Sequence, residues 1–199
     1  DVDNDGDLDV YATDRAGANQ MYRNDGGRFT PIALGEGISD PRASVGACWF
    51  DMDRDGDLDL FLANQAGAAD ALWRNDGGRF VDVAPALGMT GPHRTADEGG
   101  VGCAVGDFDN DGNFDLFVAN YGCNQLYRNN GDGTFTDVAA AVHLDVENHA
   151  VSADWGDVDN DGDLDLSVMA YEGPPGSQTP KDALYRNDGP DGFVNVIDQ

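Results

Sequence analysis

The sequence has little positive charge. Across its 199 residues, 11 Lys and Arg stand against 38 Asp and Glu, which gives a formal net charge of −27 at pH 7. Nucleic acids and anionic membrane surfaces are bound through clustered Lys and Arg, so we expect neither as a partner. Glutamate is also scarce, with 4 Glu against 34 Asp. A solvated acidic tail would use both residues, so this excess points to the short reach of Asp, which turns and metal sites need.

Long hydrophobic runs and catalytic signatures are also missing. No apolar run approaches the roughly 20 residues that cross a bilayer, and the mean hydropathy is −0.47, so we expect a soluble chain without membrane insertion. Hydrophobic residues still make up 40% of the chain, which is enough for a folded core. No local Ser/His/Asp or Cys/His pattern is recognisable. We therefore expect a protein that is not an enzyme.

What the sequence does contain is an internal repeat. The segment DVDNDGDLDV at Asp1 recurs as DMDRDGDLDL at Asp51, DFDNDGNFDL at Asp107 and DVDNDGDLDL at Asp157, with offsets of 50, 56 and 50 residues. A second motif follows each copy in the same order, as MYRNDGGRF, LWRNDGGRF, LYRNNGDGTF and LYRNDGPDGF. Four copies of two motifs in fixed order indicate a repeat protein.

Each repeat reads as short strands joined by tight turns. Small and apolar runs such as SVGACWF precede three of the acidic segments, and apolar runs such as LFLAN follow them. The Asn-Asp-Gly-Gly segments are hairpin signals between a third strand and a fourth. Four strands in about 50 residues predict a β-propeller blade. Calcium-binding solenoids repeat over far shorter periods, and EF-hands need flanking amphipathic helices, so both are disfavoured.

The predicted fold is therefore all-β, with blades of four antiparallel strands and an acidic loop between strands 1 and 2. We expect a single β-propeller segment over residues 1–199, with repeats at approximately 1–43, 44–99, 100–149 and 150–199. The first repeat lacks its first strand, so the sequence predicts three complete repeats and one incomplete repeat. Further residues of the same protein, or a neighbouring copy packed head to tail, would supply that strand.

The acidic loops have the pattern of a metal site. In D-x-D-x-D-G-x-x-D, positions 1, 3, 5 and 9 are Asp and position 6 is Gly in all four copies. Hard oxygen ligands on a tight loop favour Ca²⁺ over the rigid octahedron of Mg²⁺, and by analogy with the EF-hand position 7 would contribute its backbone carbonyl. The alternative, plain Asp- and Gly-rich turns, explains one or two carboxylates but not four.

We therefore predict about four bound Ca²⁺ ions with a structural role. The predicted ligands are Asp1, Asp3, Asp5, Asp7 and Asp9; Asp51, Asp53, Asp55, Asp57 and Asp59; Asp107, Asp109, Asp111, Asn113 and Asp115; and Asp157, Asp159, Asp161, Asp163 and Asp165. Asp7, Asp57, Asn113 and Asp163 would bind through the backbone alone, so their side chains are expected to be dispensable.

These motifs resemble a known family. The acidic loops between Gly/Ala-rich and apolar strands, together with the RNDGG hairpins, resemble the FG-GAP or VCBS-type repeats of integrin α-subunit propellers, and the FVDVAPALGM link is similar to the cartilage acidic protein group. The resemblance covers essentially the whole chain. It implies Ca²⁺ bound by the motif's Asp residues on one face of a propeller, with adhesion or ligand contacts on the opposite face or rim. Such propellers close with about seven blades, more than this chain provides.

Three further residue types recur. Arg23, Arg74, Arg128 and Arg186 each precede an Asn, which suggests pairing with Asp between blades rather than a ring of anion sites. Trp49 and Trp155 occupy matching positions and are expected to pack between blades rather than stack on a sugar. Among the three cysteines, Cys103 lies in the expected first strand of one repeat and Cys123 just after its second strand, so a disulfide between them is geometrically possible; buried free thiols are the other interpretation.

The sequence thus predicts an extracellular, calcium-stabilised β-propeller that acts as a binding or adhesion scaffold for a protein or glycan ligand. Millimolar external Ca²⁺ saturates weak sites that a cytosol would leave empty, so we expect a secreted, periplasmic or cell-surface protein. Two alternatives stay open: a structural protein assembling head to tail into a fibre or ring, and an accessory domain of a secreted carbohydrate-active enzyme.

Overall fold

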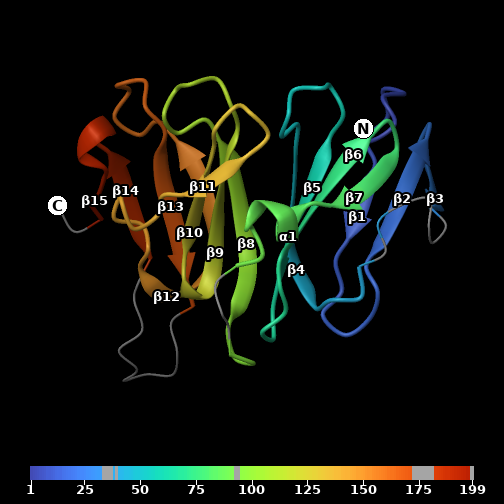
Figure 1. Ribbon diagram of the computed structural model, residues 1–199, viewed down its shortest axis with the longest axis horizontal. Coiled ribbons are helices and arrows are strands. Elements are labelled where there is room, and N and C mark those ends of the chain that lie inside the picture. The colour runs from blue at the N-terminus through green and yellow to red at the C-terminus, as the bar shows by residue number, and fades with distance from the viewer. Residues whose placement is uncertain (33–37, 39, 92–94, 172–181, 198–199) are drawn as a thin grey trace.

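The structure, a computed structural model, describes residues 1–32, 38, 40–91, 95–171 and 182–197 (Figure 1). It is all-β with almost no helix, which confirms that part of the predicted fold. The sheets are antiparallel and stand side by side along the long axis of the molecule, an arrangement consistent with propeller-like repeats (Figure 1). Within the described residues, no helix has the length and apolar character needed to cross a bilayer.

The strands lie where the repeat pattern predicts them. Repeat 1 contains β1 (Val10–Ala12), β2 (Gln20–Asp25) and β3 (Arg28–Pro31), and repeat 2 contains β4 (Ser44–Phe50), β5 (Asp59–Asn64), β6 (Ala71–Asp76) and β7 (Arg79–Asp82). Repeat 3 contains β8 (Gly99–Gly106), β9 (Asp115–Cys123), β10 (Gln125–Asn129) and β11 (Phe135–Asp137). Repeat 4 contains β12 (Glu147–Gly156), β13 (Asp165–Ala170), β14 (Ala183–Asn187) and β15 (Phe193–Asn195). The short helices are α1 (Ala84–Leu87) and the 3₁₀ turn η1 (Gly189–Asp191).

The sheets of repeats 3 and 4 are joined, which the sequence did not predict. Repeat 1 forms the sheet β1-β2-β3 and repeat 2 the sheet β4-β5-β6-β7, whereas β8 to β15 form one eight-stranded sheet. The junction is between β9 and β12, where Tyr121, Gly122 and Cys123 pair with the stretch from Glu147 to His149. Both strands extend beyond their predicted ends, so their extra residues meet and pair.

The hydrophobic core lies between successive sheets. Strand β5 is buried on both faces, and its side chains alternate in direction as in any strand. Leu60 and Leu62 pack in a cluster with Tyr11 of repeat 1, whereas Phe61 packs in a cluster with Leu116 of repeat 3. This two-sided burial explains the continuous apolar run of the second strand. Each repeat therefore completes its core only against its neighbours.

Glycines in the first strands let neighbouring backbones approach closely, as predicted. A Cβ on Gly46 would lie 2.8 Å from the Val101 carbonyl oxygen, and one on Gly102 would lie 2.8 Å from the Val151 carbonyl oxygen. These contacts join β4 to β8 and β8 to β12. No side chain fits in either gap, so the spacing of the repeats depends on these glycines.

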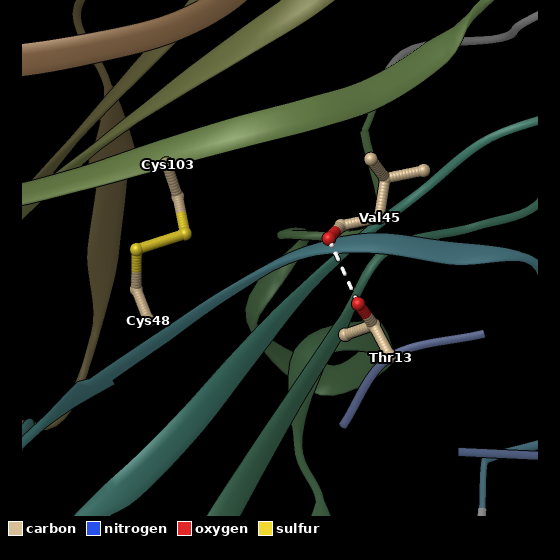
Figure 2. The surroundings of a disulfide bond; sticks show 4 residues. All are labelled: Thr13, Val45, Cys48 and Cys103. Atoms are coloured by element: carbon tan, nitrogen blue, oxygen red, sulfur yellow. Dashed lines mark hydrogen bonds between the residues drawn. A yellow bond between two sulfur atoms is a disulfide. The ribbon is translucent and has the colours of Figure 1, made fainter. Parts of the chain in front are cut away.

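The close approach of β4 and β8 also places a disulfide between repeats 2 and 3. Cys48 and Cys103 are bonded across these strands (Figure 2), and Cys123 is an exposed free thiol. Neither possibility considered from the sequence holds, because Cys103 is bonded to Cys48 rather than Cys123 and the one free thiol is exposed rather than buried. In the β8–β9 register Cys103 lies opposite Val118, and five residues of strand, about 17 Å, separate Val118 from Cys123.

The tryptophans pack between repeats, as predicted. The ring of Trp49 makes edge contacts with Tyr11 at 6.3 Å and with Phe80 at 6.4 Å between ring centres. Trp155 stacks on Phe108 of repeat 3, with 6.4 Å between ring centres and 14° between ring planes.

Repeats 1 and 2 are also joined by a hydrogen bond. The Thr13 hydroxyl donates to the carbonyl of Val45 at 3.0 Å (Figure 2).

The disulfide generates a stability prediction. Its cysteines are 55 residues apart, and closing a loop of that length stabilises a fold by about 2–4 kcal/mol. We expect the double substitution Cys48→Ser, Cys103→Ser to lower the free energy of unfolding in urea by that amount, while Cys123→Ser changes it little. Thiol titration of the unfolded, non-reduced chain should find one free thiol; three free thiols would contradict the assignment.

Candidate metal centre

The four acidic loops line one edge of the molecule. Acidic loops 1 to 4, with positions counted from the first Asp, are residues 1–9, 51–59, 107–115 and 157–165. Loops 2 to 4 connect the first and second strands of their repeats, loop 1 precedes β1, and all four lie along the upper edge in Figure 1. Each loop turns through a left-handed residue at position 4 and a glycine at position 6, for example Asn110 with φ 58° and Gly112 with φ 87°. The predicted positive φ of the motif glycine is confirmed.

Carboxylates fold each loop by accepting backbone hydrogen bonds. In loop 3, Asp107 accepts the N–H groups of Asp111 at 3.0 Å and Gly112 at 2.8 Å, and Asp111 accepts the N–H of Asn113 at 2.7 Å. The same bonds recur in the other loops. The backbone N–H groups thus turn inward and hold the carboxylates of positions 1 and 5 in place.

Position 9 is the most buried carboxylate of each loop from the second onward. Asp59 and Asp115 are 0% exposed and Asp165 is 1% exposed. In loop 2, Asp59 accepts the N–H of Met52 at 2.7 Å through Oδ2 and the N–H of Asn75 at 2.8 Å through Oδ1. The equivalent bonds are present in the other three loops. Position 9 therefore fastens the start of the loop to the third strand of its repeat.

The carboxylates of each loop converge on a point. Each of the following groups offers three oxygen atoms within 4.8 Å of one another: Asp1, Asp3 and Asp5; Asp51, Asp53 and Asp59; Asp107, Asp109 and Asp115; Asp157, Asp159 and Asp165. Positions 1 and 3 belong to every group, and position 9 to three of them. Such a cluster of hard oxygen donors fits a divalent cation. The acidic loops could therefore hold metal ions.

Burial and crowding of these carboxylates change their acidity. Burial raises the pKa of Asp59 to about 7, although the N–H groups of Asn75 and Met52 act to lower it and the carboxylates of Asp53 and Asp55 raise it further. Burial and the same kind of crowding raise the pKa of Asp115 to about 7 as well. Without a cation, folding therefore places like charges in a poorly solvated cluster.

The side chain at position 7 has a role that the sequence did not predict. Asp57 accepts the N–H of Gly77 in the following hairpin at 2.8 Å and the side-chain amide of Asn4 at 3.1 Å. Asp7 accepts the N–H of Gly26 at 2.6 Å. These two side chains join loops 1 and 2 to their own hairpins, so the expectation that they are dispensable is wrong for those loops. Their backbone carbonyls as ligands stay a prediction.

The recurring Arg and Asn residues divide their roles differently from the prediction. Arg23, Arg74 and Arg186 pair with the Asp two residues further along the same hairpin, at 3.0, 2.9 and 2.7 Å, and so do not bridge repeats. The neighbouring asparagines of repeats 2 to 4 make connections between repeats instead. We call Asn24, Asn75, Asn129 and Asn187 the hairpin asparagines. The recurrence of these asparagines was visible in the sequence. The partners of Asn75, Asn129 and Asn187 in another repeat were not.

Removing a position-9 carboxylate should destabilise the fold even without metal. In Asp59→Ala, the buried N–H groups of Met52 and Asn75 lose their acceptor, and each unsatisfied group costs about 1–3 kcal/mol. We expect urea unfolding in chelator to show a loss of about 2–4 kcal/mol. Asp53→Ala, at an exposed position of the same loop, is the control and should cost under about 1 kcal/mol. Equal losses would contradict the structural role of Asp59.

The family of the chain follows from this repeated unit. No curated protein matches the sequence. The family model of the FG-GAP-like repeat matches three times, at residues 1–62, 51–118 and 107–168. Each match begins at the first Asp of an acidic loop, continues through the next acidic loop and ends within the strand that follows it. Because the matches together run from residue 1 to residue 168, the chain belongs to the FG-GAP-like repeat family.

Proposed function

We propose that the chain is a calcium-stabilised β-propeller segment that serves as a binding or adhesion scaffold outside the cell. The observation that carries the proposal is the convergence of three carboxylate oxygens within 4.8 Å in each of four loops. Family membership supports a propeller-like binding scaffold.

Calcium suits the loops better than magnesium. Ca²⁺ accepts six to eight oxygen ligands in flexible geometry, whereas Mg²⁺ demands a near-ideal octahedron and keeps several waters. In loop 3, the carboxylates of Asp107, Asp109 and Asp115 converge. The carboxylate of Asp111 and the carbonyl of Asn113 are the further ligands that the proposal assigns from the motif. When bound, the ions supply positive charge: four Ca²⁺ would change the net charge from −27 to −27 + 8 = −19.

The distribution of sequence variation supports a scaffold. The acidic loops are nearly identical and lie at one edge. The links from the second to the third strand lie at the other edge and differ in length: residues 13–19 in repeat 1, residues 65–70 in repeat 2 and Asn124 alone in repeat 3. A uniform edge suits a shared structural task, and a variable edge suits ligand contacts. Ligand binding at the variable edge is therefore part of the proposal.

The calcium proposal predicts a large effect of chelation on stability. Clustered carboxylates repel one another without a cation, so binding free energy becomes folding free energy. We expect excess chelator to lower Tm by about 10 °C or more, with Ca²⁺ restoring it better than Mg²⁺ at equal concentration. An unchanged melting curve in chelator would contradict the proposal.

A matched pair of substitutions tests the ligand assignment within loop 3. Asp111→Ala removes a carboxylate ligand and should lower the calcium affinity of that loop about tenfold or more. Asn113→Ala keeps the backbone carbonyl, although it removes a side-chain bond to Asp111 of 2.8 Å, so its effect should be small. Calorimetric titration of both variants measures the difference. Equal losses of affinity would contradict the assigned ligands.

The pH dependence of stability should change sign with calcium. Without metal, the pKa of Asp59 and of Asp115 is raised to about 7, above the unfolded value of about 3.9. The folded state then binds more protons between these values, so stability in chelator should rise as pH falls from 7.5 to 5. With Ca²⁺ bound, protons compete with the metal, so stability should fall over the same range. Parallel curves of Tm against pH in the two conditions would contradict this.

A further inference from the structure

We propose that the hairpin asparagines of repeats 2 to 4 couple neighbouring metal loops, so that cation binding at one loop strengthens binding at the loop of the next repeat. The inference rests on the proposed cation binding and adds a positioning role for Asn75, Asn129 and Asn187, which are not themselves ligands.

A chain of hydrogen bonds runs from loop 2 to loop 3 through Asn129. The side-chain amide of Asn129 donates to the carbonyl of Met52, at position 2 of loop 2, at 2.8 Å. The backbone N–H of the same residue donates to Asp115, at position 9 of loop 3, at 2.8 Å. One residue thus contacts the backbone of one loop and a proposed ligand of the next.

The chain continues in the same form through the other repeats. Asp115 also accepts the N–H of Phe108 at 3.0 Å, and the carbonyl of Phe108 accepts the side-chain amide of Asn187 at 2.9 Å. The N–H of Asn187 then donates to Asp165, at position 9 of loop 4, at 2.8 Å. Between loops 1 and 2, the side-chain amide of Asn75 in repeat 2 donates to the carbonyl of Val2 in loop 1 at 3.5 Å. Loops 1 to 4 are therefore joined by one series of alternating links.

Burial gives these links their strength. Asn75, Asn129 and Asn187 are 0, 2 and 3% exposed. Water does not replace a buried hydrogen bond that breaks, so the groups move together or leave a polar atom unsatisfied. By contrast, the direct contacts between loop tips, in which Asn4, Arg54 and Asn110 reach the next loop, are exposed. Solvent competes for them, and we expect them to carry less of the coupling.

The geometry explains how occupancy of one loop affects the next. The peptide of position 2 lies between two proposed ligands, positions 1 and 3, so a cation that binds both fixes the direction of the Met52 carbonyl. The Met52 carbonyl, once fixed, positions the Asn129 side chain through their hydrogen bond. The backbone N–H of Asn129 in turn positions the Asp115 carboxylate. A loop whose position-9 carboxylate is already fixed by this hydrogen bond loses less conformational entropy when it binds its cation. The sites are therefore coupled in the positive sense, and the coupling is reciprocal.

The test is a mutant cycle read by hydrogen exchange and mass spectrometry during a Ca²⁺ titration. Peptides covering residues 51–58 and 107–114 report loops 2 and 3 separately. Asp53→Asn weakens loop 2 without a change in side-chain size. In the otherwise native chain, we expect this substitution to raise the Ca²⁺ concentration that half-protects loop 3 by about fivefold or more. In the Asn129→Ala background, we expect Asp53→Asn to leave that concentration nearly unchanged.

Two control variants isolate the link. Asn24→Ala removes a residue that matches Asn129 within its hairpin, because each of the two side chains accepts a glycine N–H. The Asn24 amide, however, donates to the carbonyl of Leu8 in its own loop, so Asn24→Ala breaks no link between loops. Arg54→Ala removes the exposed contact between loops 2 and 3. Both controls should keep most of the fivefold shift. If Asn129→Ala fails to fold, the cycle of Asp109→Asn with Asn187→Ala reads loops 3 and 4 in the same way.

Each outcome decides the question. If Asp53→Asn leaves the Ca²⁺ concentration that half-protects loop 3 unchanged, the sites are independent and the coupling is overturned. The proposed function would still stand in that case, provided that Ca²⁺ protects both loops. A shift of equal size with and without Asn129 shows that another path carries the coupling and overturns the role of the asparagine. If Ca²⁺ protects neither loop, the proposed function itself fails, and the coupling with it.

Discussion

The buried carboxylate at position 9 of acidic loops 2 to 4 is the constraint on which the rest of the structure depends. Asp59, Asp115 and Asp165 each accept two backbone N–H groups, one from their own loop and one from the hairpin asparagine of the same repeat. These bonds fix the loop against the sheet. They also hold a negative charge in a poorly solvated place beside other carboxylates, which a fold sustains at neutral pH when a cation compensates it.

The position-9 constraint extends from single loops to the order of the repeats. Because the cores lie between sheets, a repeat has no complete core of its own. The hairpin asparagines, the close approach at Gly46 and Gly102, and the Cys48–Cys103 disulfide all act across the same junctions. Core packing, buried hydrogen bonds and the covalent link therefore stabilise interfaces between neighbouring repeats. A change at one loop should be felt in its neighbours, as in other repeat proteins with nearest-neighbour energetics.

Contacts within a repeat were predictable from the sequence, and contacts between repeats were not. The run Ser44–Phe50 and the apolar stretch of β5 were recognised as strands because period, turns and residue type all agree at short range. The partner of Cys103 was missed because it lies in another repeat, and pairing across a junction depends on a register that one sequence does not display. The same reason hid the partners of Asn129, and the joining of β9 to β12.

The candidate site shows the same division. Its carboxylates at positions 1, 3, 5 and 9 could be named from spacing alone, since the loop is local. The unequal burial of these carboxylates could not, because it is set by the hairpin that covers position 9. The second role of Asp57, as an acceptor for Gly77 and Asn4, likewise required the fold. The sequence thus indicated which carboxylates gather in each loop, and the structure showed that the buried one at position 9 fastens loops 2 to 4 to their hairpins.

The most direct test of this account is native mass spectrometry of the folded chain, which counts the ions bound to each molecule. After exchange into millimolar Ca²⁺, the account predicts a folded species that carries four Ca²⁺ ions, and a shift to a broad, highly charged, unfolded distribution in chelator. A compact chain that binds no calcium, with the same charge distribution in both solutions, would contradict the claim that a cation compensates the clustered carboxylates.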